Sequence, residues 1–328
     1  MKNDNHLWVC WEDHRRSREL AKALNYTYTP LIHAGNRLRR YPVLIVKTVR
    51  LIKEKKPTVV ICQNPSIVLT FLLCCLKKIN NFKLIVDRHT NFKFKTIKSW
   101  NPKWRIFHFL SKLTIKYADL TIVTNEPLKE IVEEWGGKGF VLQDKLPELD
   151  KGKITPLEGR VNIAFVCTYS DDEPYEKVIK LFNTLPEDIH LYVTGNFNKW
   201  VDLADGKIVV PKNVHLLGFV DEEQYQSLIK SVDIVMVLTD LEYVLNCGAY
   251  EAISVDKPLI LSDTLTIRSY FKYGITYTKL DESSLVQSIK DSVNNKDKHS
   301  WDIIDNKIRM VSEWEGRKAN LEAVVSSL

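Results

Sequence analysis

The chain has 328 residues, which is long enough for about two units of 100–200 residues, each with its own core. Its longest apolar run, residues 67–76, is about half the length of a bilayer span, which argues against a transmembrane helix. Six cysteines fall mostly inside apolar segments without a Cys-x-x-Cys pair, and the N-terminus lacks an apolar leader, so we expect a reduced, cytoplasmic protein.

Charge is shared unevenly along the chain. Residues 1–150 contain 27 Lys and Arg against 14 Asp and Glu, an excess of +13. The remaining residues contain 20 against 27, or −7. A basic half suggests an anionic partner, which is a nucleic acid, an acidic membrane surface or a phosphorylated substrate. A lysine-rich surface that is merely well solvated is the simpler interpretation.

Strand and helix patterns alternate through the first half. Alternation of this kind indicates a parallel sheet with helices on both faces. Expected strands cover residues 7–10, 29–33, 58–62, 83–87 and 120–124. Expected helices cover residues 17–24, 41–55, 66–76, 102–117 and 127–135.

The pattern stops in residues 143–160, where Pro and Gly punctuate a charged connector. A second αβ series follows, with expected strands at 161–167, 189–194, 214–217, 233–238 and 258–261, and residues 300–328 are helical by pattern. We therefore expect an α/β protein of two Rossmann-like domains, 1–150 and 151–328, that face a cleft at their strand C-termini.

Residues 239–263 read as a ligand site formed by a polar loop, a short helix and a strand. The small residues Asn246, Cys247 and Gly248 would let the helix start close to a ligand, with its free amides facing a phosphate. Glu251 would lie one turn into the helix, where its carboxylate could bond the hydroxyls of a ribose.

This segment resembles the GT-B glycosyltransferases, and among them the retaining group 1 (family 4-like) enzymes. The resemblance rests on Glu251-Ala252, Asp256-Lys257-Pro258 and Ser262-Asp263. The glutamate pair of that family is separated by seven residues, which puts Tyr243 at the first position and Glu242 one residue too early. The motif assigns Glu251 and leaves open whether Glu242 or Tyr243 fills the first carboxylate position. The family also implies a terminal helix that crosses back to the first domain.

Polar loops after the other strands of the second half supply further donor-site candidates. A loop before a helix suits a diphosphate, and a glycine permits close backbone approach, although both are also ordinary turn features. The resemblance implies that a Gly-aromatic-hydrophobic loop holds the nucleobase. The donor candidates are Thr168, Tyr169, Thr194, Gly195, Asn196, Gly218, Phe219, Val220, Asn246, Cys247, Gly248 and Glu251. The family's Arg or Lys after the first loop is missing, since the nearest cation, Lys177, lies well inside the next helix.

The first half supplies the other candidates. In resembling enzymes a histidine after the fourth strand contacts the sugar near the bond that breaks, and His89 occupies that place. The catalytic candidates are His89, Arg88 and Glu242. Two arginines in the first turn of a helix run against the helix dipole, which favours a role in clamping anions. The acceptor or phosphate candidates are Glu12, Arg15, Arg16, Asn64 and Asn91.

The expected chemistry needs no protein nucleophile. Breaking the bond between the anomeric carbon and phosphate builds negative charge on the diphosphate, which fixed amides and cations stabilise. For retention, the family implies that the departing phosphate oxygen takes the acceptor proton. For inversion, Asp87, Glu12 or His89 would serve as the base. We expect no metal and no cofactor, because Asp171-Asp172 lacks the Asp-x-Asp arrangement and the nucleotide-sugar, by family weight UDP-linked, is a co-substrate.

The sequence thus predicts a hexosyltransferase-type enzyme of polysaccharide biosynthesis that extends a glycan or lipid-linked acceptor. Residues 92–116 interleave aromatic and basic residues, which suits peripheral contact with an anionic membrane better than nucleic acid. Two alternatives stay open: a sugar-nucleotide epimerase of the same architecture and a binding protein without turnover.

Overall fold

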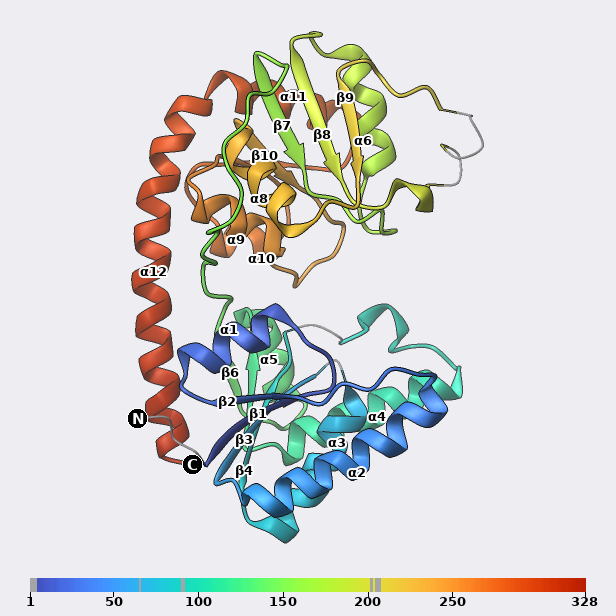
Figure 1. Cartoon of the computed structure of the whole chain (residues 1–328), viewed down its shortest axis with the longest axis vertical. Helices are drawn as coiled ribbons and strands as arrows, with labels where there is room; N and C mark the ends of the chain where they lie inside the picture. Colours follow the sequence, from blue (N-terminus) through green and yellow to red (C-terminus); the bar gives the residue numbers. More distant parts are fainter. Residues whose placement is uncertain (1–4, 65, 90–91, 201–202, 204–207) are drawn as a thin grey trace. The chain divides into compact units, whose positions relative to one another are not determined.

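The computed structural model describes residues 5–64, 66–89, 92–200, 203 and 208–328. The chain divides into two compact units. Unit 1 comprises Met1–Lys145 and Glu313–Leu328, and unit 2 comprises Leu146–Ser312. Each unit is built around one parallel sheet with helices on both faces (Figure 1).

The sheet of unit 1 has six strands in the order β2-β1-β3-β4-β5-β6, all parallel. The strands are β1 His6–Cys10, β2 Thr27–Pro30, β3 Val59–Gln63, β4 Lys83–Asp87, β5 Leu120–Val123 and β6 Gly139–Val141. The helices are α1 Arg15–Ala23, α2 Arg37–Lys55, α3 Ile67–Asn80, α4 Pro102–Tyr117 and α5 Glu126–Glu134, with a 3-10 turn, η1, at Phe94–Thr96. Strand order reverses between β1 and β3.

Local sequence explains where these helices begin and end. The Asn36 and Asn101 side chains accept hydrogen bonds from Arg39 N and Lys103 N, which caps α2 and α4. Lys56 and Asn81, in the left-handed conformation, end α2 and α3.

Apolar side chains on both faces of this sheet form the core of unit 1. On one face, α2 and α3 cover β1, β3 and β4 (Figure 1), and apolar side chains of these strands and helices form one buried cluster. On the other face, Trp8 and Ile61 pack against Leu20 of α1 and against Trp314 and Leu321 near the chain's end. The last part of α12 (Lys296–Ser326) therefore belongs to the core of unit 1.

The sheet of unit 2 has six parallel strands in the order β12-β11-β10-β7-β8-β9. If β7 to β12 are numbered one to six and the sheet is followed from β9, the order is 3-2-1-4-5-6, which is that of the Rossmann fold. The order reverses between β7 and β10. The strands are β7 Val161–Phe165, β8 Ile189–Thr194, β9 Val214–Gly218, β10 Ile234–Val237, β11 Leu259–Ser262 and β12 Ile275–Thr278. The helices are α6 Tyr175–Leu181, α8 Glu222–Ser231, α9 Cys247–Ser254, α10 Leu265–Tyr270 and α11 Glu282–Asn294, with 3-10 turns η2 Phe182–Thr184 and η3 Phe197–Lys199.

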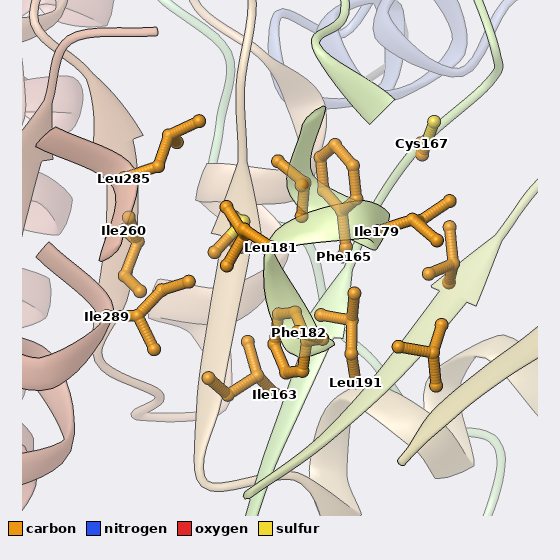
Figure 2. Close-up of a cluster of buried hydrophobic side chains, with 14 of the residues drawn as sticks. Ile163, Phe165, Cys167, Ile179, Leu181, Phe182, Leu191, Ile260, Leu285 and Ile289 are labelled. Carbon is orange, nitrogen blue, oxygen red and sulfur yellow. The ribbon is translucent and has the colours of Figure 1, made fainter. Parts of the chain in front are cut away.

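Two clusters of buried side chains cover the faces of the second sheet. Figure 2 shows the first, in which Phe165 and Leu191 of the strands lie near Ile179 of α6, and Ile260 of β11 lies near Leu285 and Ile289 of α11. The second cluster packs α8, α9, α10 and the first part of α12 against the opposite face. Strands buried on both sides explain the continuous apolar runs of the sequence.

The predicted fold class, an α/β chain with two Rossmann-like sheets, is confirmed. Most predicted strands coincide with observed ones within one or two residues, and residues 83–87 and 189–194 match β4 and β8 fully. The structure adds two short edge strands, β6 and β12, that the sequence pattern did not indicate. Among the described helices, none has the length and apolar character to cross a bilayer.

Candidate functional site

The predicted site residues lie at the carboxyl ends of the strands in both units. In unit 2, Thr168 follows β7, Asn196 follows β8, and Phe219 follows β9. In unit 1, Glu12 follows β1 and Asn64 follows β3. Ligands of open parallel sheets bind at this edge, beside the reversal of strand order. The fold therefore gathers the candidates of each unit at one edge of its own sheet.

The loop after β7 is closed by a carboxylate. Glu173 Oε2 accepts hydrogen bonds from the backbone N–H groups of Thr168 and Ser170, both at 2.9 Å. These are amides of the kind that the sequence offered to a diphosphate, and an anionic group of the protein already occupies them. The following helix α6 has Pro174 as its N-cap and no side-chain cap. A phosphate at this loop would have to displace Glu173.

Two glycines shape the neighbouring loops. Gly195 has φ +99°, and a Cβ there would collide with the backbone carbonyl of Cys167. Its N–H donates to the carbonyl of Gly218 at 2.9 Å, and Gly218 has φ +72°. The buried Thr194 side chain accepts from Cys167 N–H at 3.2 Å. These contacts hold the ends of β7, β8 and β9 together, as a site of close backbone approach requires.

A cation that sequence analysis did not single out lies at this edge. Lys199, in the η3 turn after β8, donates from Nζ to the carbonyl of Thr168 at 2.9 Å. Lys177, the nearest cation in the sequence, instead donates to Leu280 O at 3.2 Å. Lys199 therefore lies at the loop after which the resembling family has an Arg or Lys for the donor phosphates. Its only sequence signal is a lysine within five residues of the Thr194-Gly195 turn.

Helix α9 begins close to the strands because of Gly248. A Cβ on this buried glycine would lie 3.1 Å from Val237 and 3.2 Å from Val166, so a larger residue would push the helix away. Asn246 is the N-cap and makes no side-chain cap bond, and Cys247, the first helical residue, is exposed. The helix N-terminus thus approaches the end of β7 with an uncapped first turn.

Glu251 is only 7% exposed and is held by α8. Its Oε2 accepts a hydrogen bond from the Tyr225 hydroxyl at 2.5 Å. A buried carboxylate fixed by a phenol is prepared to bind a pair of hydroxyls without losing side-chain freedom.

Glu242, the earlier glutamate, caps a different helix. Its carboxylate accepts from Thr266 N–H at 2.8 Å and from Leu265 N–H at 3.3 Å, at the start of α10. Burial acts to raise the pKa of Glu242, but the hydrogen bonds from Thr266 and the neighbouring amides outweigh it and lower the pKa. Tyr243, the other candidate for this position, has φ +67°.

The remaining donor candidates differ in exposure. Phe219 is 89% exposed, so its ring is free to stack on a base, and Val220 is half-buried. Tyr169 is buried at φ +57° and packs on Tyr175 with ring centroids 4.9 Å apart, so its side chain belongs to the core. Asn196 is exposed and caps the η3 turn.

In unit 1, Arg16 and Asp87 form a buried ion pair. Arg16 Nη2 lies 3.0 Å from Asp87 Oδ1, its Nε also donates to this carboxylate, and its Nη1 donates to Asp144 at 2.5 Å. Burial acts to raise the pKa of Asp87, but the charges of Arg16 and His89 together with the hydrogen bonds from Arg16 outweigh it and hold that pKa well below its ordinary range. Because its guanidinium already bonds two carboxylates, Arg16 would clamp phosphate only by exchanging these partners.

His89 lies beside this pair. Its Nδ1 is 3.3 Å from Asp87 Oδ2, close enough for an ionic contact but without hydrogen-bond geometry. The His14 ring, at the start of α1, lies against it with centroids 5.1 Å apart. Desolvation, and then the neighbouring His89, lower the pKa of His14. Two imidazoles and one ionised carboxylate therefore meet at the predicted catalytic loop.

Arg88 points to the other face of the sheet and is fully buried. With the Asn64 amide oxygen turned toward it, Asn64 accepts from Arg88 Nε at 2.9 Å and from Nη2. Thr114 Oγ1 lies 3.4 Å from Nη2, and the guanidinium lies 5.3 Å from the centre of the Phe92 ring. Desolvation lowers the pKa of Arg88 to about 9. Arg88 and Asn64 thus form a buried polar contact that is separate from the His89 cluster.

The other acceptor candidates lie at the surface or outside the described residues. Glu12 is exposed and pairs with Arg40 at 2.9 Å. Arg15 is exposed as the first residue of α1. Asn91 lies outside the residues that the structure describes.

Solved structures with the same fold include a complex with UDP-glucose, a synthase and an assigned epimerase. Anabaena Alr3699/HepE, in complex with UDP-glucose, aligns with a TM-score of 0.72 and 14% identity over 98% of this chain and 92% of its own. Sucrose-phosphate synthase from Thermosynechococcus elongatus aligns with a TM-score of 0.71 and 13% identity over 91% and 81%. A Listeria monocytogenes protein assigned as a UDP-N-acetylglucosamine 2-epimerase aligns at 0.57 and 14% identity over 91% of each chain.

These likenesses show the GT-B fold. Comparison with curated protein sequences gave no significant match.

Family models match both units. The model of Glycosyltransferase Family 4 matches residues 3–140, and the model of Glycosyl transferases group 1 matches residues 147–310. The second match covers half of the chain, and the two follow one another along it. The chain belongs to the group 1 glycosyltransferases and is a GT-B enzyme of that family.

Proposed function

We propose that the protein transfers a sugar from a UDP-linked donor to a glycan or lipid-linked saccharide, with retention and without a metal ion in the transfer step. Unit 2 binds the donor, and unit 1 binds the acceptor. The observation that carries this proposal is Glu251, a buried carboxylate held by Tyr225 one turn into a helix with an uncapped N-terminus. The structure of Alr3699/HepE, a protein of the same fold, contains UDP, which supports uracil as the nucleobase of the donor.

The second sheet provides what a leaving diphosphate needs. Amides at the start of α9 and the ammonium of Lys199 supply fixed positive charge, and Gly195 permits close backbone approach. Such preorganised charge stabilises the diphosphate as the bond to the anomeric carbon breaks. The leaving oxygen then takes the proton of the acceptor hydroxyl on the same face, which gives retention.

The carboxylates of unit 1 support retention over inversion. Asp87 is fully buried in its ion pair with Arg16, and a carboxylate with a lowered pKa is a weak base. Glu12 is exposed and paired with Arg40. We assign His89 to contact with the transferring sugar and Asp87 to the positioning of His89.

The decisive experiment measures donor binding and turnover separately. UDP at about 100 times its dissociation constant should stabilise the native state by roughly 2.7 kcal/mol in a thermal-shift assay, and ADP and GDP should do less. Glu251→Gln should abolish this shift, and Glu187→Gln, an exposed glutamate beside the opposite end of β8, should preserve it. A shift that survives Glu251→Gln would refute the ribose assignment.

Turnover distinguishes the alternatives. Release of UDP that depends on a saccharide acceptor supports a transferase. Conversion of a sugar nucleotide into its epimer without acceptor would establish the epimerase, and nucleotide binding with no turnover would establish the binding protein.

We further propose that unit 1 contacts an anionic membrane at the cytoplasmic face. Residues 88–118 contain eight Lys and Arg and no Asp or Glu. Large apolar side chains point outward among these cations: Trp100 is 86% exposed, and Ile106 and Phe109, on one side of α4, are 60% and 63% exposed. Arg105 lies over the Trp100 ring at 5.5 Å. We call this set, with Ile97, Lys98, Lys103 and Lys112, the α4 surface.

The α4 surface has the chemistry of an interfacial site. Exposed Trp and Phe rings enter the headgroup region, and flanking lysines attract acidic lipids. A lipid-linked acceptor would reach unit 1 from such a membrane.

A further inference from the structure

Two histidines and a glutamate meet on unit 2 away from the donor edge. His190 is the second residue of β8, and His215 is the second residue of β9, the edge strand. Glu158 lies three residues before β7, at the end of the connector. In the strand register, Tyr192 pairs with His215, so Tyr192, His215 and His190 share one face of the sheet.

The three ligand atoms lie close together. His190 Nδ1 and His215 Nε2 are 2.9 Å apart and share one proton, and a carboxylate oxygen of Glu158 lies within 4.8 Å of a ring nitrogen of each histidine. Zinc–nitrogen bonds of about 2.0–2.1 Å at a tetrahedral angle place two nitrogens about 3.3–3.4 Å apart. A small rotation of each ring would therefore let both lone pairs face one ion that replaces the shared proton.

Tyr192 holds two of these groups in place. Its ring stacks on His215 with centroids 4.5 Å apart and planes 10° apart. Its hydroxyl oxygen accepts a hydrogen bond from the backbone N–H of Glu158 at 3.2 Å. Outer contacts that orient the ligands are a regular part of protein metal sites.

We propose that Glu158, His190 and His215 form a binding site for a divalent transition metal ion of the zinc class. Two imidazoles and one carboxylate suit Zn²⁺, Co²⁺ or Ni²⁺, whereas Mg²⁺ and Ca²⁺ prefer oxygen ligands alone. The sequence did not reveal this set, because the two histidines are 25 residues apart and meet only through strand pairing.

The site is structural. Thr194, at the donor edge, lies four positions after His190 in β8, about 13 Å along the extended chain. The ion would link Glu158 of the connector to β8 and β9, the two outermost strands on one side of the sheet. It takes no part in sugar transfer, so this proposal does not depend on the proposed function.

Metal titration of the full-length protein tests the site. After dialysis against EDTA, the protein should bind one equivalent of Co²⁺, with visible absorption and without the near-ultraviolet band of thiolate ligation. Zn²⁺ should displace the Co²⁺ and raise the melting temperature. His190→Asn and Glu158→Gln should each weaken binding at least tenfold, and His33→Asn, which changes a histidine of unit 1, should leave it unchanged.

Two results would overturn the proposal. One is equal Co²⁺ affinity in the wild type and in both site variants, measured on proteins whose melting temperatures without metal are the same. The other is a spectrum with thiolate bands, which would place the ion at cysteine. Circular dichroism of each metal-free variant shows whether weak binding reflects a lost ligand or a lost fold.

Discussion

The ion pair of Arg16 and Asp87 shows how one long-range contact decides the properties of several site residues. Arg16 stands in the first turn of α1, and its partner lies 71 residues away at the end of β4. Both side chains are buried, so each is stable there only because the other is present. The same carboxylate faces His89, which couples the position of the predicted catalytic histidine to the pair.

Asp87→Asn tests this coupling. At pH 7 the variant should lose about 3–5 kcal/mol of unfolding free energy, because it leaves Arg16 without its buried counter-ion. The folded-state pKa of Asp87 is lowered, so its contribution is complete above the unfolded pKa of about 3.9 and declines as the pH falls further. Urea unfolding should therefore show a gap between wild type and variant that narrows below about pH 4. A gap that is constant with pH would contradict the lowered pKa.

Residue identities predicted some features of the site and not others. Gly195 was singled out because a glycine permits close backbone approach, and Gly218 because it begins a Gly-aromatic-hydrophobic loop; both have positive φ in the structure. Lys199 was not singled out, because a lysine in a short polar turn looks like any solvent-exposed residue in the sequence. The partners of Arg16, Asp87 and Asp144, could not be predicted from the sequence, because the fold alone brings these distant residues together.

Lys199→Met probes the cation that sequence analysis missed. Loss of one positive charge near the donor phosphates should weaken UDP binding about tenfold, equivalent to about 1.4 kcal/mol. Lys177→Met is the matched control, because Lys177 donates to Leu280 O instead. Calorimetric titration of both variants measures the effect. Equal affinity in the two variants would remove Lys199 from the donor site.

The two glycines of the donor edge form a second matched pair. Gly218→Ala places a methyl group at an ordinary contact distance, 3.5 Å, from the Phe197 ring. Its free energy of unfolding should therefore fall only by the cost of a positive φ, about 1 kcal/mol. Gly195→Ala meets the fixed carbonyl of Cys167 as well and should lose about 3 kcal/mol. Thermal unfolding of both variants provides the comparison. Similar losses would show that the loop after β7 moves freely.

At the scale of elements, periodicity located the strands that are buried on both faces. Continuous apolar runs such as residues 234–237 leave little choice of structure. The edge strands β6 and β12 escaped because they have three and four residues and include Gly139 or alternate with threonine. Pairing with one neighbour, which no local pattern records, makes them strands. The second expected strand, residues 29–33, lies at Thr27–Pro30 for the same reason, since β2 is also an edge.

Helix α12 contributes to the cores of both units, and its tryptophans test this. Trp314 is 5% exposed, packs on the sheet of unit 1, and donates from Nε1 to Gln143 O at 3.2 Å. Trp314→Ala should cost about 3–5 kcal/mol in urea unfolding. Trp301 on the same helix is 74% exposed, and Trp301→Ala should cost less than about 0.5 kcal/mol. Equal costs would mean that α12 does not pack on unit 1 in this way.

At the scale of the whole molecule, the two units share an architecture and differ in strand order and charge. Unit 2 has the Rossmann order, and unit 1 places its second strand at the edge instead. The net charge of +13 in residues 1–150 follows directly from the sequence. Whether this charge forms part of a membrane-binding surface does not, because the sequence does not tell which apolar residues remain exposed beside the lysines. The structure separates them: Phe92 is buried, and Trp100 and Phe109 are exposed.

The α4 surface predicts how the whole protein responds to lipid and salt. Wild-type protein should co-sediment with vesicles that contain phosphatidylglycerol and much less with pure phosphatidylcholine vesicles, because each lysine near an acidic surface contributes about 1 kcal/mol. Raising the salt from 0.1 to 1 M shortens the Debye length from about 10 to 3 Å and should release most of the protein.

Substitution separates the apolar part of this contact from its charge. Trp100→Ser combined with Phe109→Ser keeps every lysine and removes two exposed rings, so it should weaken vesicle binding at low salt and leave UDP binding intact. Trp301→Ser removes an equally exposed ring from α12, outside the α4 surface, and should bind vesicles as the wild type does. If the double variant binds like the wild type, charge alone attracts the protein. If Trp301→Ser also loses binding, the contact lies elsewhere than on α4.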